Sequence, residues 1–379
     1  MIPRRQFLAL TGAATLASCG AAPVLPGRAP EAVADDLRPV PNAGWDAWVA
    51  AFRPRARSAG ITSATLDAAF RGAGFIPGVV TRDRSQPESS YSLEDYLSIA
   101  ASDERLAKGR AAFARQRDTL TALESRYGVD AEIICAIWGL ESRYGERRGT
   151  VPVISATSTL AFDGRRGAFF EKQLIAALRI LQSGDVTPAR MVGSWAGAMG
   201  HTQFIPTSYL AYAVDFDGDG RRDIWSEDPT DALASAAAYL ANAGWTRGLK
   251  WGGETGAPGT PAGTTITPQA GGPSFTVTSN FRAIKRYNNS DLYAIGIGHL
   301  ADRIAGGGPI RGRFPPDANG LTRADRIALQ ERLTARGYDT GGTSGVIGPK
   351  SRAAIEAYQW DAGLGVTGVP SPALLAQLG

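Results

Sequence analysis

Apolar residues recur at helical spacing along most of the chain from Trp45 onward. Hydrophobic positions three or four residues apart lie on one face of a helix. The helices predicted in this way cover residues 45–52, 63–70, 93–99, 102–127, 131–144, 169–182, 232–242 and 292–304. The segment 274–278 has the pattern of a short strand, and it follows a Gly, Thr and Pro-rich insertion that we expect to form an exposed loop or hairpin. The pattern therefore predicts a mainly α-helical fold.

The last 59 residues or so have a separate pattern. Two predicted helices, 324–336 and 350–360, are joined by a glycine turn at 345–349, and a last short helix follows Gly368. A few amphipathic helices can close a small core without a disulfide. The predicted organisation is a signal at 1–19, a tether at 20–41, a large domain at 42–305, a Gly, Pro and Arg-rich linker at 306–320 and a small domain at 321–379.

The N-terminus has the features of an export signal. Arg4-Arg5 precede a short apolar run with small residues, which ends at Leu16-Ala17-Ser18-Cys19. The paired arginines resemble a twin-arginine signal, and the last four residues resemble a bacterial lipobox. We therefore expect a periplasmic protein that is tethered to the outer membrane as a lipoprotein through Cys19. The alternative is that Cys19 is an ordinary thiol inside a cleaved signal, and no later run has the roughly 18 apolar residues of a membrane span.

Charge and cysteine content exclude several classes of protein. Removal of Arg4 and Arg5 with the signal lowers the formal net charge from +4 to +2, which does not indicate a nucleic-acid partner. Cys135 would then have no intrachain partner, and its apolar surroundings predict a buried small hydrophobe. The chain has 2 histidines, so a histidine-based zinc site is not expected.

Glu141 is the first candidate for catalysis. It follows Ile134, Ile137 and Trp138 by seven, four and three residues, which places its carboxylate on the apolar face of the predicted helix. Burial of a carboxylate raises its pKa, and a general acid that acts near neutral pH needs a raised pKa. The alternative is a surface glutamate, either at the helix end or paired with Arg143 or Arg147. Glu124 heads an identical Glu-Ser-Arg-Tyr-Gly sequence but ends a more polar helix.

Several ordered blocks resemble the B-type lytic murein transglycosylases. The blocks are residues 127–134, 137–145, 194–209, 215–225 and 286–290. The tail, 321–378, separately resembles the three-helix peptidoglycan-binding module. The resemblance implies a lysozyme-like, mainly α catalytic domain. It also implies a lyase that cleaves the bond between N-acetylmuramic acid and N-acetylglucosamine in peptidoglycan glycan strands and leaves 1,6-anhydromuramic ends.

The resemblance also assigns site residues. Glu141 matches the single acid/base catalyst, and the substrate's 2-acetamido group is expected to replace a protein nucleophile. The positions expected to bind substrate are Ser194, Gln203, Tyr239, Tyr287, Asn288, Arg165 and Arg166. The two arginines are expected on the peptide-bearing side of the sugar, although they could also be a solvated loop pair. His201-Thr202 departs from the aromatic residue and glycine that the family often has before the glutamine, which puts subsite detail in doubt.

An aspartate-rich loop predicts a structural cation. Asp215, Asp217 and Asp219 alternate with Phe and Gly as in the first half of an EF-hand, and Arg221 could offer its carbonyl. The resemblance supplies Asp231 as the closing ligand of Ca²⁺, with Asp228 as a second choice. The alternative is an Asp/Gly turn that caps the helix at Asp231. No cofactor is expected for the chemistry itself.

Two other functions are consistent with the sequence. The first is a muramidase that uses water, since the sequence does not exclude a base for water. The second is a peptidoglycan-binding scaffold without activity, against which the presence of Glu141, Ser194, Gln203 and Tyr287 argues. Cell-wall synthesis or division proteins are conceivable partners that the sequence does not identify.

Overall fold

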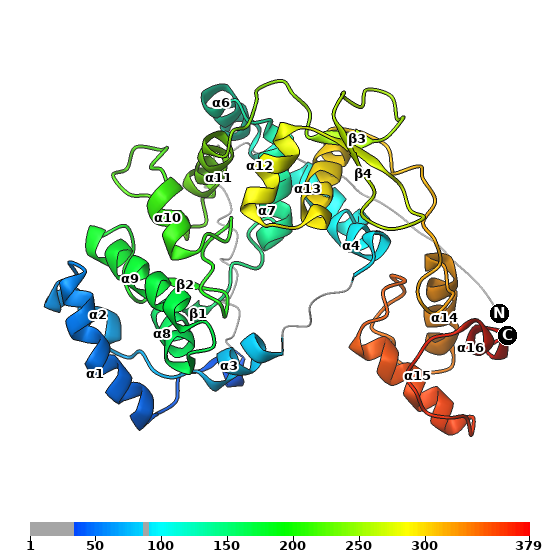
Figure 1. Ribbon diagram of the computed structural model, residues 1–379, viewed down its shortest axis with the longest axis horizontal. Helices are drawn as coiled ribbons and strands as arrows, with labels where there is room; N and C mark the ends of the chain where they lie inside the picture. Colours follow the sequence, from blue (N-terminus) through cyan, green and yellow to red (C-terminus); the bar gives the residue numbers. More distant parts are fainter. Residues whose placement is uncertain (1–33, 86–90) are drawn as a thin grey trace, which may run out of the picture. The chain divides into compact units, whose positions relative to one another are not determined.

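The computed structural model describes residues 34–85 and 91–379 (Figure 1). The predicted signal with Cys19, and residues 20–33 of the predicted tether, lie outside the described residues. The described end of the predicted tether belongs to the fold, because the short 3-10 helix η1 (Asp35–Leu37) packs against α3 and Val40 forms a β-bridge with Phe75.

The large domain is mainly helical, as the sequence predicted. Its helices are α1 (Ala43–Ser58), α2 (Ser63–Phe70), α3 (Pro77–Arg84), α4 (Leu93–Ala100), α5 (Asp103–Arg115), α6 (Arg117–Tyr127), α7 (Ala131–Ser142), α8 (Val153–Asp163), α9 (Gly167–Ser183), α10 (Pro206–Tyr212), α11 (Thr230–Asn242), α12 (Ser279–Tyr287) and α13 (Asp291–Ile304). Helices α3, α8, α10 and α12 were not predicted. In α8, nine consecutive buried residues include Ser and Thr and give no alternation between apolar and polar faces. The stretch predicted as one helix at 102–127 is two helices that meet at Gln116, whose φ of −104° and ψ of 20° are not helical.

Two small antiparallel sheets complete the large domain. β1 (Val151–Pro152) pairs with β2 (Val192–Gly193). The predicted strand is β5 (Phe275–Val277), which lies between β3 (Gly252–Glu254) and β4 (Thr264–Ile266). The Gly and Pro-rich insertion therefore forms the two outer strands and the loop that joins them.

Helix α7 lies at the centre of the largest core (Figure 1). It packs against α5, α6, α11 and α13. Ile134 and Ile137 are fully buried and Trp138 is nearly so, and burial of each such side chain contributes about 1.5–3 kcal/mol. Cys135 is buried and free, and its thiol contacts the Gly109 carbonyl, as predicted for a small core residue. This packing fixes α7, and with it the position of Glu141 at its last turn.

The small domain has its own core. It consists of α14 (Arg323–Ala335), α15 (Pro349–Asp361) and α16 (Pro372–Gln377), close to the predicted bounds. Thr322 and Asp325 form a capping box at the start of α14. The buried residues of this core are Leu321, Leu329, Leu333, Ala354, Ile355, Leu374 and Leu378.

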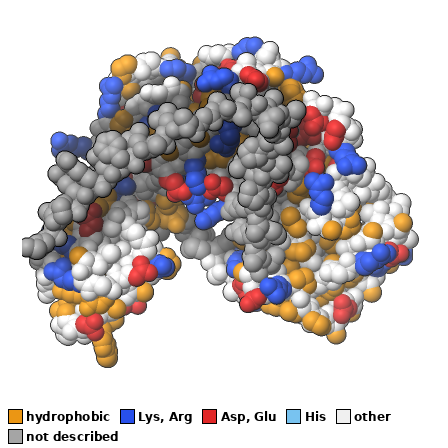
Figure 2. All heavy atoms as spheres, turned by 180° about the vertical axis from the view of Figure 1, so that it is seen from behind, with side chains coloured by type: hydrophobic (Ala, Val, Ile, Leu, Met, Phe, Trp, Pro, Cys, Tyr) orange, Lys and Arg blue, Asp and Glu red, His pale blue; other side chains and the backbone are white. Residues whose placement is uncertain are grey.

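The surface carries charges of both signs. On the face seen in Figure 2, Lys and Arg side chains are interspersed with Asp and Glu side chains, and no broad basic surface is visible. This distribution agrees with the small net charge and gives no support to nucleic-acid binding. None of the helices in the described part of the chain is long and apolar enough to span a membrane.

Candidate active site

Glu141 occupies the last turn of α7, where the backbone turns sharply. Arg143 and Tyr144 both have left-handed backbone conformations, with φ of 51° and 59°, and Gly145 follows with φ of 87°. Such conformations cost about 1–3 kcal/mol each for non-glycine residues and concentrate at functional sites. The Tyr144 ring folds back onto the helix, and a Cβ at Gly139 would collide with it. The small residue at Gly139 therefore allows the tight helix end beside Glu141.

The partner of the Glu141 carboxylate is Tyr293. The phenol Oη of Tyr293 donates a hydrogen bond of 2.6 Å to Glu141 Oε1. Among the described residues, neither Arg143 nor Arg147 forms an ion pair with Glu141, and Arg143 pairs with Glu104 instead. Tyr293 comes from α13, 152 residues later in the chain, and it was not predicted as a site residue. Its position depends on the packing of α13 against α7, which no local pattern encodes.

The acidity of Glu141 is strongly changed by its surroundings. Burial raises the pKa of Glu141 to about 7, while the hydrogen bond from Tyr293 lowers it. Among the described residues, no second carboxylate contributes to this shift. Burial and the nearby Glu141 charge raise the pKa of Tyr293 well above its usual value, so this tyrosine remains a donor. The side chain of Glu141 is nevertheless partly accessible to solvent, which a catalyst that must reach a substrate requires.

Tyrosine rings form one wall beside the carboxylate. Tyr287 stacks on Tyr293 with ring centroids 6.5 Å apart, and Tyr239 meets Tyr287 at 4.9 Å. The hydroxyl of Tyr287 donates to the Thr202 carbonyl at 2.5 Å, and burial raises the pKa of Tyr287 well above its usual value, with a further contribution from Glu141. Tyr96 also lies within electrostatic range of Glu141, since burial and then the Glu141 charge raise the pKa of Tyr96 to about 12. Tyr96 was likewise missed from the sequence.

Ser194 and Gln203 lie on one tightly folded segment. Ser194 Oγ accepts a hydrogen bond from the Ala198 amide at 3.1 Å. Gln203 has a left-handed φ of 52°, and its Nε2 donates to the carbonyls of Arg148 and Gly200. Arg143, Tyr144 and Gln203 are the non-glycine residues with positive φ in the described part of the chain. The backbone strain thus gathers at two segments that carry predicted site residues.

His201 joins this segment to α7. The indole Nε1 of Trp138 donates to His201 Nδ1 at 3.1 Å, so the proton of the ring lies on Nε2, which is 2.8 Å from the Ser226 carbonyl. Ser142 Oγ also donates to the His201 carbonyl at 2.6 Å. Burial lowers the pKa of His201 to about 4, so this histidine is neutral near pH 7. His201, which departs from the family pattern, therefore has a structural place between α7 and the loop that contains Ser226.

The remaining predicted binding residues have different surroundings. Asn288 is exposed directly after α12. Arg165 and Arg166 both pair with Asp83, a carboxylate buried on α3, and the Arg165 hydrogen bond holds the pKa of Asp83 below its usual value. Through these pairs, the two arginines join α3 to the segment that precedes α9.

The aspartate loop has the donor chemistry for a hard cation. One oxygen from each of Asp215, Asp217 and Asp219 lies within 4.8 Å of the others, and carboxylate oxygens are preferred ligands of Ca²⁺. The Asp231 carboxylate lies behind the loop and accepts hydrogen bonds from the amides of Phe216 and Asp223, at 2.8 and 2.9 Å. Asp231 thus holds the backbone of the loop, while the three other aspartates form the cluster.

Comparison with known proteins places the chain in a family. The Transglycosylase SLT domain matches residues 44–267 and 253–302, and the peptidoglycan binding domain matches residues 322–378. Membrane-bound lytic murein transglycosylase B of Escherichia coli is 34% identical over 222 residues, which is 50% of this chain and 60% of that protein.

Solved structures of lytic transglycosylases are also similar to this chain. SltB3 from Pseudomonas aeruginosa in complex with NAG-anhNAM-pentapeptide is 43% identical, with a TM-score of 0.70 over 89% of this chain and 100% of that chain. The Escherichia coli lytic transglycosylase Slt35 in complex with calcium is 29% identical, with a TM-score of 0.58 over 70% of this chain and 93% of that chain. The chain therefore belongs to the SLT transglycosylase family and has a C-terminal peptidoglycan binding domain.

Proposed function

We propose that this protein is a lytic transglycosylase that cleaves the β-1,4 bond between N-acetylmuramic acid and N-acetylglucosamine without adding water. The observation that carries the proposal is the state of Glu141, a carboxyl on the apolar face of α7 whose pKa burial raises to about 7. Such a group is available both as an acid and as a base near neutral pH. The complex of SltB3 with NAG-anhNAM-pentapeptide shows that a relative binds a 1,6-anhydro product.

In the first step, Glu141 gives its proton to the glycosidic oxygen as the bond from that oxygen to the muramic anomeric carbon breaks. The carbonyl oxygen of the 2-acetamido group bonds to the anomeric carbon in the same step and takes the place of a protein nucleophile. Among the described residues, the hydrogen-bond partner of Glu141 is Tyr293 and no carboxylate shifts its pKa, which is consistent with this substrate-assisted route. The polymer is then cut, and Glu141 is a carboxylate.

In the second step, the Glu141 carboxylate takes the proton of the sugar's C6 hydroxyl. The C6 oxygen attacks the anomeric carbon, the bond to the acetamido oxygen breaks, and a 1,6-anhydro ring forms. Attack within one molecule has a large advantage of proximity over attack by water. Glu141 is protonated again, so one residue completes the cycle. Tyr293 stabilises the carboxylate form of Glu141, because the hydrogen bond that it donates is strongest when Glu141 is charged.

Ser194, Gln203, Tyr239, Tyr287 and Asn288 are proposed to bind the glycan strand. Gln203 Nε2 is committed to two backbone carbonyls, so its carbonyl oxygen is the group available to a substrate hydroxyl or amide. The peptide-side role of Arg165 and Arg166 is retained as a proposal, with Asp83 as the residue that orients both. The small domain is proposed to hold the enzyme on the polymer.

A location on the periplasmic side of the bacterial envelope follows from the proposed substrate. The Escherichia coli relative is named as membrane-bound, and lipidation of Cys19 is the proposed anchor. Fractionation of cells that express the Cys19→Ala variant tests the anchor. Release of the variant into the soluble periplasmic fraction supports it, and retention in the membrane contradicts it.

The decisive variant for catalysis is Glu141→Gln, which keeps the shape and the acceptor for Tyr293 but cannot donate and reclaim a proton. We expect it to bind purified sacculi and to release no soluble muropeptides. Undiminished release would refute the assignment of Glu141, and a wild-type protein that binds sacculi without releasing muropeptides would favour a scaffold. Glu124→Gln is the matched control, because Glu124 heads the same five-residue sequence at the end of α6.

A further inference from the structure

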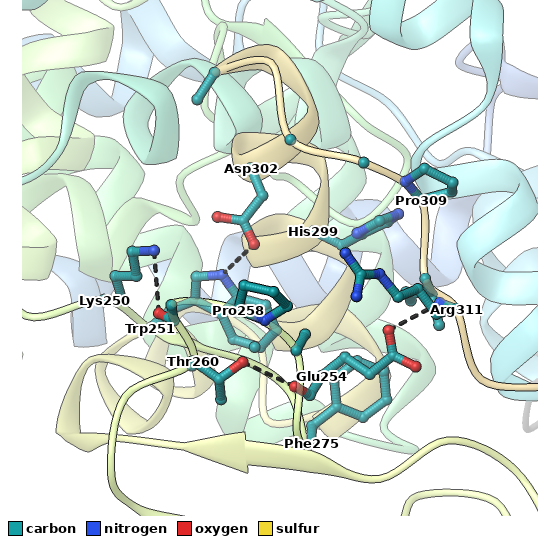
Figure 3. Close-up of a pocket in the computed structure, with 18 residues that line it drawn as sticks. Lys250, Trp251, Glu254, Pro258, Thr260, Phe275, His299, Asp302, Pro309 and Arg311 are labelled. Atoms are coloured by element: carbon teal, nitrogen blue, oxygen red, sulfur yellow. Dashed lines mark hydrogen bonds between the residues drawn. The ribbon is translucent and has the colours of Figure 1, made fainter.

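A cavity lies at the opposite end of α13 from Tyr293. It has a volume of about 380 Å³ and is enclosed by β3, the loop that follows it, the C-terminal half of α13 and residues 307–311 (Figure 3). Asp302 is nine residues after Tyr293, which is roughly 13 Å along a helix. Ligand pockets are commonly about 300–1,000 Å³ in volume, so the cavity is large enough for a small molecule or for one residue of a peptide.

The acidic group of the cavity is Asp302. One carboxylate oxygen, Oδ2, accepts a hydrogen bond from Trp251 Nε1 at 3.1 Å. The other oxygen, Oδ1, has no hydrogen bond from a described residue. Burial raises the pKa of Asp302 to about 6, and the charge of Lys250 lowers it, so the carboxylate is ionised above that value. Asp302 thus offers one negatively charged acceptor to a ligand.

His299, one helical turn before Asp302, also faces the cavity (Figure 3). Burial lowers the pKa of His299 to about 4, and Arg303 contributes to the shift. The imidazole is therefore neutral near pH 7 and has one nitrogen that accepts a hydrogen bond. Together, His299 and Asp302 provide acceptors for a group that carries several N–H donors.

Two cationic side chains line the cavity, Lys250 and Arg311, and Lys250 Nζ donates to the Gly259 carbonyl at 3.1 Å. The amide of Arg311 donates to Glu254 Oε2 at 2.8 Å, and the amide of Gly312 donates to Glu254 Oε1 at 2.5 Å, so Glu254 fixes the backbone of this segment. Arg311 is exposed and, like His299, lines the cavity (Figure 3). A planar guanidinium is well suited to a carboxylate, which it can bind through two N–H groups.

Other ligand classes fit less well. A metal ion would need several ligand atoms close together. In the described part of the chain, the ligand atoms of Asp302, His299 and Glu254 do not lie close enough to hold one metal ion together. A sugar ring prefers an exposed aromatic face, but Trp251 and Phe275 are 3% and 1% exposed. A simple anion would face the Asp302 carboxylate. The cavity therefore favours a molecule that carries both an ammonium and a carboxylate.

We propose that this cavity is a binding site for an amino-acid zwitterion, with the ammonium at Asp302 and His299 and the carboxylate at Arg311. The source of the ligand rests on the proposed function, because a peptidoglycan strand carries peptide stems with free amino-acid groups. Binding there would hold a peptide stem without touching Glu141, which does not line the cavity.

Histidine NMR tests this site directly. The chain has 2 histidines, so a protein labelled in its imidazoles gives one reporter in the cavity and one control, His201, beside α7. The full chain is titrated near neutral pH with meso-diaminopimelate, with its diamide and with its N,N′-diacetyl derivative. We expect saturable shifts of the His299 signals with diaminopimelate alone and no change at His201. No saturable shift at His299, equal shifts with the three probes, or equal shifts at both histidines would each overturn the proposal.

Two variants connect the signal to the proposed contacts. Asp302→Asn keeps an acceptor for Trp251 and removes the charge, and Arg311→Gln removes the guanidinium. Each is expected to weaken binding of diaminopimelate about tenfold or more, as the loss of one charge-assisted hydrogen bond implies. Arg313→Gln, on an exposed residue outside the cavity, is the matched control and should bind as the wild type does. Equal binding by all three variants contradicts the proposal.

The NMR titration of His299 does not depend on catalysis. Arg311→Gln is expected to cleave peptide-free glycan strands at the wild-type rate. If Glu141→Gln were fully active, the proposed function would fail while the diaminopimelate result would still stand. If His299 did not respond while Glu141→Gln was inactive, only the binding site would be rejected.

Discussion

Tyr293 of α13 and Glu141 of α7, which are 152 residues apart in sequence, are joined by a hydrogen bond of 2.6 Å. The bond lowers the pKa of Glu141 against the opposing effect of burial. Two helices, α7 and α13, therefore set the acidity of the proposed catalyst together. A shift of one helix relative to the other would change that acidity.

The Tyr293→Phe variant removes this bond and keeps the ring. The Glu141 carboxylate loses its donor, so its pKa should rise above that of the wild type. Loss of a hydrogen bond to a charged group costs about 1.5–3 kcal/mol, so activity should fall about tenfold or more. The pH profile of the initial rate checks the assignment. Activity falls at high pH as Glu141 loses the proton that it must donate, so this alkaline limb should move to higher pH in the variant. An unchanged profile with a lower rate would indicate a purely structural role for Tyr293.

The Glu141→Gln variant should be more stable than the wild type at alkaline pH. The pKa of Glu141 is raised to about 7 in the folded state, while an unfolded glutamate has a pKa of about 4.3. The unfolded state therefore loses its proton first, and wild-type stability is lost as pH rises through this window. The difference can reach about 3 kcal/mol above the folded pKa and should vanish below the unfolded one. Thermal unfolding of both proteins at several pH values measures it, and equal melting temperatures throughout would contradict a buried carboxylate.

The free energy of unfolding should decrease in acid because of His201. Its pKa is lowered to about 4 by burial, while an unfolded histidine has a pKa of about 6.5. As pH falls from the unfolded value toward the folded one, the unfolded state takes up a proton that the folded state excludes, which costs up to the order of 2 kcal/mol. The His201→Gln variant can still accept from Trp138 and donate to Ser226, so it should show a weaker dependence on pH in this range. An identical dependence would mean that His201 is more open to solvent than its contacts indicate.

The loop of Asp215, Asp217 and Asp219 should make stability depend on Ca²⁺. A ligand that binds only the folded state stabilises it by about 2.7 kcal/mol at a hundred times its Kd. The melting temperature should therefore fall when a chelator is added and recover with excess Ca²⁺. Asp217→Asn should lose most of this response, while Asp118→Asn, on an exposed residue of α6, should keep it. A melting temperature that changes with neither the chelator nor Ca²⁺ would contradict a cation site. The loop would then be an aspartate turn whose carboxylates accept hydrogen bonds from its own amides.

Deletion of residues 321–379 should separate binding from cleavage. The small domain has a hydrophobic core of its own, so its removal should leave the large domain folded. We expect weaker binding to sacculi and nearly unchanged cleavage of short soluble strands. Sedimentation with sacculi measures binding, and the rate of cleavage of short strands measures activity. Equal binding before and after the deletion would contradict the proposed role of the small domain in holding the enzyme on the polymer.

Much of the fold could be predicted from the sequence, because most helices of the large domain have one apolar and one polar face. Helix α8 was missed, since burial on every side removes that contrast. The face of Glu141 followed from its spacing to Ile134 and Ile137. Its partner Tyr293 did not, because their contact depends on how α13 packs against α7. The pairing of Arg165 and Arg166 with Asp83 was hidden for the same reason, since 82 residues separate Arg165 from Asp83.

The mass of the released products tests the central claim most directly. Purified sacculi are digested with the full chain, and the muramic ends of the soluble products are weighed by mass spectrometry. The proposed mechanism predicts 1,6-anhydromuramic ends, which are lighter than hydrolysed ends by one water, and no products with Glu141→Gln. Products with reducing muramic ends, heavier by one water, would instead show a muramidase and contradict attack by the C6 hydroxyl.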